Sequence, residues 1–161
     1  MCLNGLGSVA EWATAMIALV ALLFAWRQIR SNEKAAGDAA ALSAWRDYLA
    51  ACMKYTEYTS HTLVKRVLPS HTTKNIADQD SVESERYLWF LSTLLLGCEQ
   101  VLLNASNSEG WWKNLIDQVS YHWPSFAQLL KPWAPQYDER MLRLLEEGVE
   151  YGRFRYPDWV D

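Results

Sequence analysis

The chain has 161 residues, of which half are hydrophobic and nine are tryptophan. This length allows one domain, or an anchor with one small domain, and the apolar content suffices for a core. A formal net charge of −4 argues against a generally basic nucleic-acid-binding protein, although a local basic patch stays compatible with it. Cys2, Cys52 and Cys98 match no metal-ligand spacing, so we expect reduced, mostly buried thiols and no cofactor.

The first predicted element is a membrane-spanning helix. Residues 11–26, EWATAMIALVALLFAW, hold one carboxylate and no other ionisable side chain. The apolar run Trp12–Trp26 alone spans about 22 Å, so we extend the helix back to Gly7 to cross the roughly 30 Å hydrocarbon core. Trp12 and Trp26 then lie where interfacial aromatic anchors are expected.

Charge placement predicts how this helix is oriented. No Lys or Arg precedes the apolar run, whereas Arg27, Arg30 and Lys34 follow it, which argues against the alternative of a cleavable signal peptide. The positive-inside rule therefore predicts a single-pass protein with a very short N-terminus outside. We expect residues 1–30 to form the anchor and residues 31–161 a cytoplasmic helical domain.

One face of the anchor is small or polar. Alternate steps of three and four residues reach Glu11, Thr14, Ala18, Ala21, Ala25, Gln28 and Asn32. A 3.5-residue period is typical of left-handed helix bundles, and small residues let membrane helices approach closely. We therefore expect a homo-oligomer in which the first six of these residues line a pore, with a ring of Glu11 carboxylates favouring cations at its outer mouth. The alternative is a chance stripe on an Ala-rich helix, with Glu11 reaching the interface.

The rest of the chain is expected to be helical, because no alternating pattern is long enough for a sheet. The anchor helix is expected to run to Lys34 and to bend or break at Gly37, before a second helix capped by Asp38 and ending near Tyr58. Residues 59–80, around Pro69, predict a loop. The apolar face of the second helix is Leu42, Trp45, Leu49, Cys52 and Tyr55 or Thr56.

A third helix is expected from Asp80 or Ser81 to about Asn104, with Glu83 completing a capping box. Because Tyr87–Ser108 carries a single charge, a second membrane span is the alternative there. The uncharged run is only about twelve residues long, which favours a buried core helix. Its predicted apolar seam is Leu88, Leu91, Leu95, Cys98 and Leu102.

Three further helical segments follow. The first starts at Asn107 or Ser108 and ends at Pro124, the second is a short turn at residues 125–131, and the last is Asp138–Tyr151. Residues 132–135 form a Pro-rich connector. The predicted fold class is all-α, with one N-terminal transmembrane helix followed by a cytosolic bundle of four or five helices.

No motif predicts an enzyme. His61, His71 and His122 show no paired metal-ligand spacing. Arg66 and His71 match the Arg-x4-His spacing of helical HEPN ribonucleases, but Pro69 would interrupt the helix that this site needs. We therefore expect no catalytic residues.

The C-terminal residues combine cations with aromatic rings. Arg153, Phe154, Arg155 and Tyr156 offer stacking surfaces beside guanidinium groups, as in sites for single-stranded nucleic acid or nucleotides. The alternative is that the rings pack on the bundle while the arginines pair with nearby acids such as Glu146, Glu150 or Asp158. Lys65 and Arg66 either complete this basic site or contact anionic lipid headgroups.

The layout of EWATAMIALVALLFAWRQIR followed by helices from Asp38 to Tyr151 resembles single-pass effectors of bacterial anti-phage defence systems, and most of all the membrane effector of the Hailong system. The resemblance covers the architecture of the whole chain and includes no diagnostic motif. It implies a tetrameric ion channel of the bacterial inner membrane that depolarises the cell. It also implies a single-stranded DNA oligomer, made by a partner nucleotidyltransferase, that binds the cytosolic domain and holds the channel closed. The rival hypothesis is a membrane-tethered adaptor that binds a protein partner and conducts nothing.

Overall fold

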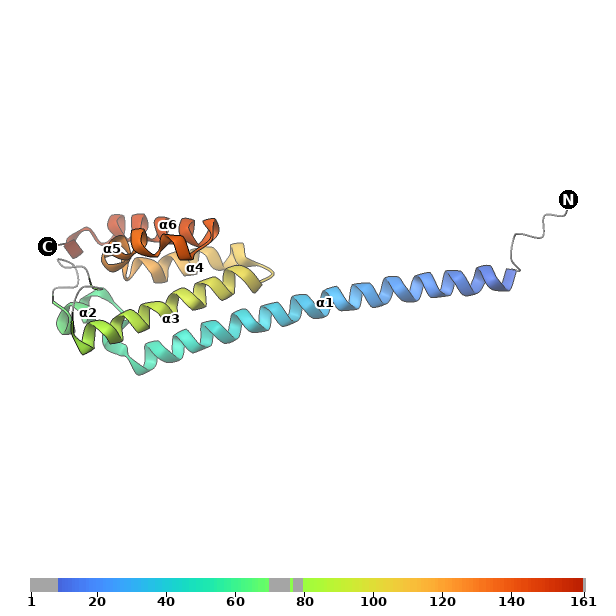
Figure 1. Ribbon diagram of the computed structural model, residues 1–161, viewed down its shortest axis with the longest axis horizontal. Helices are drawn as coiled ribbons and strands as arrows, with labels where there is room; N and C mark the ends of the chain where they lie inside the picture. Colours follow the sequence, from blue (N-terminus) through green and yellow to red (C-terminus); the bar gives the residue numbers. More distant parts are fainter. Residues whose placement is uncertain (1–8, 70–75, 77–79, 161) are drawn as a thin grey trace.

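A computed structural model describes residues 9–69, 76 and 80–160 of the chain (Figure 1). The described residues form six α-helices and no strand, so the predicted all-α class is confirmed. A long rod, the first part of α1 (Val9–Lys54), projects from a domain in which one helix lies along the second part of α1 and the C-terminal helices lie beyond it (Figure 1). The α-helices are α1 (Val9–Lys54), α2 (His61–Val67), α3 (Val82–Asn104), α4 (Ser108–Ser120), α5 (Trp123–Trp133) and α6 (Glu139–Arg155). Short 3-10 helices are η1 (Thr56–Tyr58), η3 (Ala134–Gln136) and η4 (Pro157–Val160).

Helix α1 is a single helix of 46 residues, about 69 Å long at 1.5 Å per residue. The break predicted at Gly37 is therefore wrong. Gly37 allows close packing instead, because a Cβ atom there would lie 2.6 Å from the carbonyl oxygen of Asn104 at the end of α3. Asp38 caps no helix; it accepts hydrogen bonds from the Ser106 backbone N–H (2.7 Å) and hydroxyl (2.9 Å) and so holds the loop after α3.

The face that α1 turns toward the core agrees with the predicted one in part, because Trp45 and Cys52 are half-buried against the core. Ala41 and Tyr48 are buried, whereas Leu42 and Leu49, predicted to be buried, are exposed. Gly97 of α3 lies against this side of α1, where a Cβ atom would be in ordinary van der Waals contact with the Ala44 carbonyl oxygen and the Tyr48 Cβ, both at 3.7 Å. The two helices thus pack closely, and the bulky leucines lie outside the contact.

The segment 59–80 contains a helix that the sequence reading did not predict. Helix α2 follows Ser60, whose backbone is extended, and it buries Val64 and the adjoining Leu68. It ends before Pro69, because a residue that precedes proline is disfavoured in the α conformation, and Leu68 has φ −132° and ψ 72°. Ile76 is also buried in the core.

Helix α3 agrees with its prediction except at its start. The N-cap is Ser81, and its capping-box partner is Ser84 rather than Glu83. The predicted seam is confirmed in the core, with Leu88 only half-buried. Among the described helices only α1 is long and apolar enough to cross a membrane, so the second span at 87–108 is not supported.

The starts predicted at Asn107 and Asp138 are confirmed, whereas the start of α5 and the ends of the last three helices differ from the prediction. Asn107 caps α4, which ends at Ser120, and Pro124 lies in the first turn of α5 instead of ending α4. Helix α5 continues through Pro132, and α6, capped by Asp138, extends past Tyr151 to Arg155. Helix α6 packs mainly on α4 and α5, and α1 mainly on α3.

Aromatic side chains fill the end of the core remote from the rod. Tyr48, Tyr58, Tyr87 and Phe90 form a cluster of tilted rings with centroid separations of 5.6–6.0 Å. The Tyr87 hydroxyl lies 3.0 Å from Nδ1 of His122, which is buried, so this histidine belongs to the core. Both cysteines in the described part of the chain are free, and burial raises the pKa of the Cys98 thiol to about 12.

Candidate functional site

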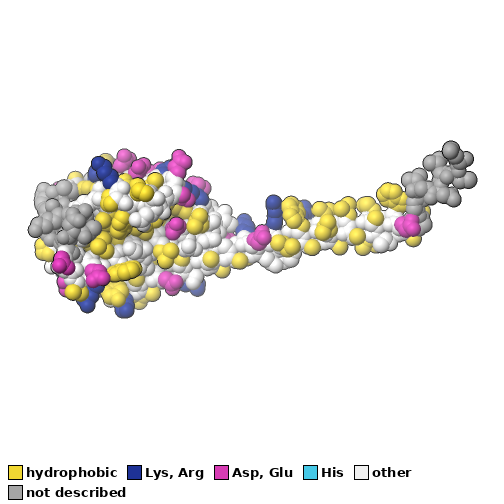
Figure 2. Space-filling view, viewed as in Figure 1, with side chains coloured by type: hydrophobic (Ala, Val, Ile, Leu, Met, Phe, Trp, Pro, Cys, Tyr) yellow, Lys and Arg dark blue, Asp and Glu magenta, His cyan; other side chains and the backbone are white. Residues whose placement is uncertain are grey.

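The rod formed by the first part of α1 contacts no other part of the described chain. Every residue from Val9 to Ala36 is exposed, and hydrophobic side chains are spread along the face of the rod that Figure 2 shows. The segment Val9–Gln28 is about 30 Å long, which matches the thickness of a hydrocarbon core. The chain thus has one helix suited by length and composition to cross a membrane.

All six predicted pore-lining residues lie on this exposed rod. Thr14 donates a hydrogen bond from its hydroxyl to the carbonyl oxygen of Ala10 (2.8 Å), and Gln28 donates from its amide to Asn32 Oδ1 (3.0 Å). These polar groups are therefore satisfied within the helix, as a lipid environment requires. Glu11 lies in the first turn of α1, where the helix dipole stabilises a carboxylate. Ala18, Ala21 and Ala25 occupy the same seam.

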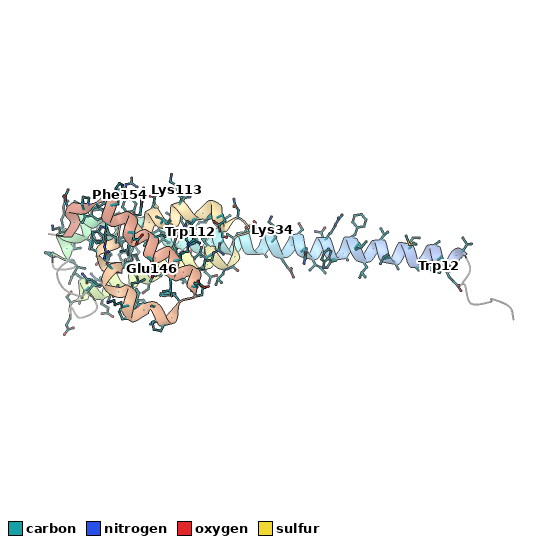
Figure 3. The ribbon with its side chains drawn as sticks, turned by 90° about the horizontal axis from the view of Figure 1, so that it is seen from above. Trp12, Lys34, Trp112, Lys113, Glu146 and Phe154 are labelled. Carbon is teal, nitrogen blue, oxygen red and sulfur yellow. The ribbon has the colours of Figure 1, made fainter. Side chains whose placement is uncertain are left out.

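The end of the rod nearest the domain is cationic. The Arg30 guanidinium lies 4.3 Å from the centroid of the Trp26 ring, which pairs an interfacial aromatic residue with a positive charge. Figure 3 shows Trp12 at the far end of the rod and Lys34 where the rod meets the domain. The two predicted tryptophan anchors thus bracket the apolar segment.

The predicted ligand-binding residues 153–156 belong to the end of α6, not to a tail. Phe154 is 86% exposed, whereas Arg153 lies over the Trp123 ring at 5.6 Å. Arg155 forms an ion pair with Asp117 (3.2 Å) and donates a hydrogen bond to the Tyr151 hydroxyl (3.2 Å).

Tyr156 stacks on Trp159 with ring centroids 3.9 Å apart, and both rings are half-buried against the domain. The alternative prediction, that the rings pack on the bundle and the arginines pair with acids, therefore describes Tyr156 and Arg155. The acid that pairs with Arg155 is Asp117, instead of the predicted Glu146, Glu150 or Asp158. Phe154 and Arg153 are exposed on the surface of the domain.

Lys65 and Arg66 are exposed on α2 rather than in a loop. Helix α2 and the C-terminal end of α6 both lie at the end of the domain remote from the rod (Figure 1). His71, the other half of the HEPN-like pair, lies outside the described residues. No group of three His, Cys, Asp or Glu side chains in the described ranges is placed to hold a metal ion.

An exposed apolar stripe on α3 was missed by the sequence reading. Val82, Trp89, Leu96 and Leu103 recur every seven residues and are all more than half exposed. Trp89 also borders a surface pocket of about 330 Å³ between α1 and α3, together with Tyr55 and Arg86. The seven-residue spacing of these side chains could have predicted the stripe. It was missed because the stripe lies beside the buried seam of the same helix, which is also apolar.

Comparisons with protein-family models, with curated proteins and with solved structures return no match to this chain.

Proposed function

We propose that this protein is a single-pass membrane effector whose α1 helices assemble into an oligomeric ion channel, while the helical domain in the cytoplasm receives the signal that controls it. The carrying observation is the continuity of α1, which runs without a break from the exposed apolar rod into the packed domain. A rotation or displacement of the domain is therefore transmitted directly to the membrane segment, without a flexible linker to absorb it.

The orientation follows from the cations at one end of the rod. Arg27, Arg30 and Lys34 lie between the apolar segment and the domain, so the positive-inside rule places the domain in the cytoplasm. In a bacterium this is the cytoplasmic side of the inner membrane.

The pore is lined by the small and polar seam. Ala18, Ala21 and Ala25 allow close approach of neighbouring helices, and Thr14 and Gln28 supply polar groups on the same side. A ring of Glu11 carboxylates at the outer mouth favours cations over anions. Conduction of cations through such a bundle would depolarise the cell, which suits a role in anti-phage defence.

The control ligand is a single-stranded oligonucleotide or a nucleotide, made by a partner nucleotidyltransferase and bound by the domain. Phe154 offers an exposed ring for stacking, and Arg153 an exposed guanidinium, with Lys65 and Arg66 as a second cationic surface. Such a ligand biases the channel only if its affinities for the open and closed arrangements differ.

The test is ion flux through proteoliposomes that contain the purified full chain. Glu11→Gln is expected to lower cation selectivity, and Ala18→Leu to block flux, since the larger side chain fills the seam. Ala13→Leu, the same substitution on the other side of the helix, and Asp47→Asn, an exposed carboxylate beyond the anchor, are the matched controls. Flux that is equal in all four variants and the wild type would contradict the pore.

A second candidate function is a membrane-tethered adaptor that binds a protein and conducts nothing. The exposed α3 stripe favours it, because apolar side chains on a surface commonly mark sites for protein partners. An adaptor would leave the proteoliposomes impermeable, whereas Trp89→Ala would weaken partner binding.

A further inference from the structure

We infer that the exposed side of α1 within the helical domain binds the same side of α1 in a second copy of this chain, so that a parallel coiled coil continues the membrane bundle into the cytoplasm. The inference rests on the proposed function for the parallel arrangement of the copies. It adds an interface that lies outside the membrane, and it rests on observations of the domain itself.

The first observation is the register of α1. The alternate steps of three and four residues that start at Glu11 do not stop at Asn32. They continue along the helix through Ala35, Ala39, Leu42, Arg46, Leu49 and Met53. Because α1 passes through Gly37 without a break, the two parts of the seam keep one phase over about six heptads.

The second observation is that this part of the seam is exposed and, apart from Arg46, apolar. All six residues are exposed, and Leu42, Leu49 and Met53 are 45%, 46% and 83% accessible. The contact with α3 uses the other side of α1, through Ala41 and Tyr48. Hence the residues of the seam are not covered by the rest of the described domain.

The third observation identifies the occupant as another α1. A 3.5-residue repeat matches a helix with the same repeat, and rigid helices that are parallel in the membrane emerge side by side at the same depth. Asn32 and Arg46 take equivalent positions in the heptad, where a single polar residue fixes the register of parallel helices at some cost in stability. In two copies at equal depth, Asn32 faces Asn32 and Leu49 faces Leu49.

Arg46 allows a test in which the inference predicts stronger association of the copies, rather than weaker. Parallel copies bring like charges together at this position, and this weakens the contacts that Leu42 and Leu49 make with the same residues of the second copy. Arg46→Leu is therefore expected to strengthen the association of copies, whereas it would leave a monomeric domain unchanged in mass.

Cysteine cross-linking in membranes tests the interface with the full chain. In a background with Cys2→Ser and Cys52→Ser, we expect Leu42→Cys and Leu49→Cys to give several-fold more covalent dimer on mild oxidation than Leu96→Cys and Leu103→Cys. The controls are also exposed leucines, but they lie on α3. A disulfide requires Cα atoms within about 7 Å, so only direct contact along the seam favours positions 42 and 49. Equal dimer at all four positions would reflect collision and overturn the inference.

Ala18→Cys in the same background separates this interface from the membrane bundle. Dimer at position 18 without dimer at 42 and 49 overturns the cytoplasmic coiled coil and leaves the proposed function standing. Dimer at 42 and 49 without dimer at 18 supports the coiled coil and contradicts the membrane pore. A second readout is the mass of the detergent-solubilised particle, which Leu42→Gln with Leu49→Gln should lower and Leu96→Gln with Leu103→Gln should not.

Discussion

The two parts of α1 are continuous in one helix but have opposite surroundings. From Val9 to Ala36 every residue is exposed, whereas from Gly37 onward one side of the helix is anchored to α3 by Ala41 and Tyr48. The first part draws no stability from tertiary contacts in the described chain, and most helical stability in proteins comes from such contacts. The apolar part of this exposed rod has the length and composition of a membrane span.

The second part shows how the domain fixes the rod. Gly37 and Asp38 hold α1 against the end of α3 and the following loop, at the point where the rod leaves the domain. The rod therefore has a defined direction relative to the domain. Substitutions in the two parts should affect different properties: unfolding of the domain in one, and insertion or assembly in the other.

The largest expected difference is between Tyr48→Ala and Leu19→Ala. Loss of the buried Tyr48 ring should lower the free energy of unfolding of the domain by about 3–5 kcal/mol, as for other large aromatic truncations. Leu19→Ala, on the rod, should change it by no more than about 0.5 kcal/mol. Urea unfolding of the detergent-solubilised chain, followed by tryptophan fluorescence, measures both. Tyr48→Phe, which removes only the hydrogen bond to Gln118 (2.9 Å), should cost about 1 kcal/mol. Equal effects of Tyr48→Ala and Leu19→Ala would show that the rod shares the core of the domain.

Gly37→Ala tests the junction between the two parts of α1, because two possible roles of Gly37 predict opposite changes in the stability of the domain. Alanine is the better helix former by about 1 kcal/mol, so a glycine that merely weakens α1 would be improved by the change. Because the new Cβ would meet the Asn104 carbonyl at 2.6 Å, we expect destabilisation by about 1–3 kcal/mol instead. The same unfolding measurement decides, and a more stable variant would mean that α1 and α3 are not in close contact there.

The smallest expected effect is the pH dependence of the contact at Asp38. Hydrogen bonds from Ser106 lower the pKa of the Asp38 carboxyl below its ordinary value. A lowered pKa in the folded state means that the contact contributes stability above the unfolded-state pKa of about 3.9, and that this contribution is lost as pH falls through the folded value.

The wild type should therefore have a higher unfolding midpoint than Asp38→Asn at pH 7, and this difference should shrink as the pH is lowered toward 3. Asp47→Asn, which changes an exposed carboxylate on the same helix, is the control. Its difference in unfolding midpoint from the wild type should not shrink in this way. A difference between the wild type and Asp38→Asn that stays constant with pH would contradict a stabilising contact of the Asp38 carboxylate at the junction.

Sequence reasoning worked where one helix carried its own signal. The buried seam of α3 and the N-cap Asp138 of α6 follow from apolar periodicity and from a side chain that bonds its own helix. It failed where a residue acts on another element. Gly37 and Asp38 have the composition of a break followed by a cap, but their partners Asn104 and Ser106 lie far along the chain.

The candidate site divides in the same way. The small seam of the rod is visible in the sequence, because spacing alone places its residues on one side of a helix. The surroundings of residues 153–156 are not, since the partner of Arg155 is Asp117 on α4 and Arg153 lies over Trp123 of α5.

By itself the sequence determined that this protein is helical, that one segment near the N-terminus has the length and hydrophobicity of a membrane span, and that positive charge follows this segment. Those properties depend on residues close together in the chain. The folded domain was needed to show that α1 is a single rod and that Leu42 and Leu49 lie outside the core, because the residues that meet α1, such as Asn104 and Ser106, lie far along the chain.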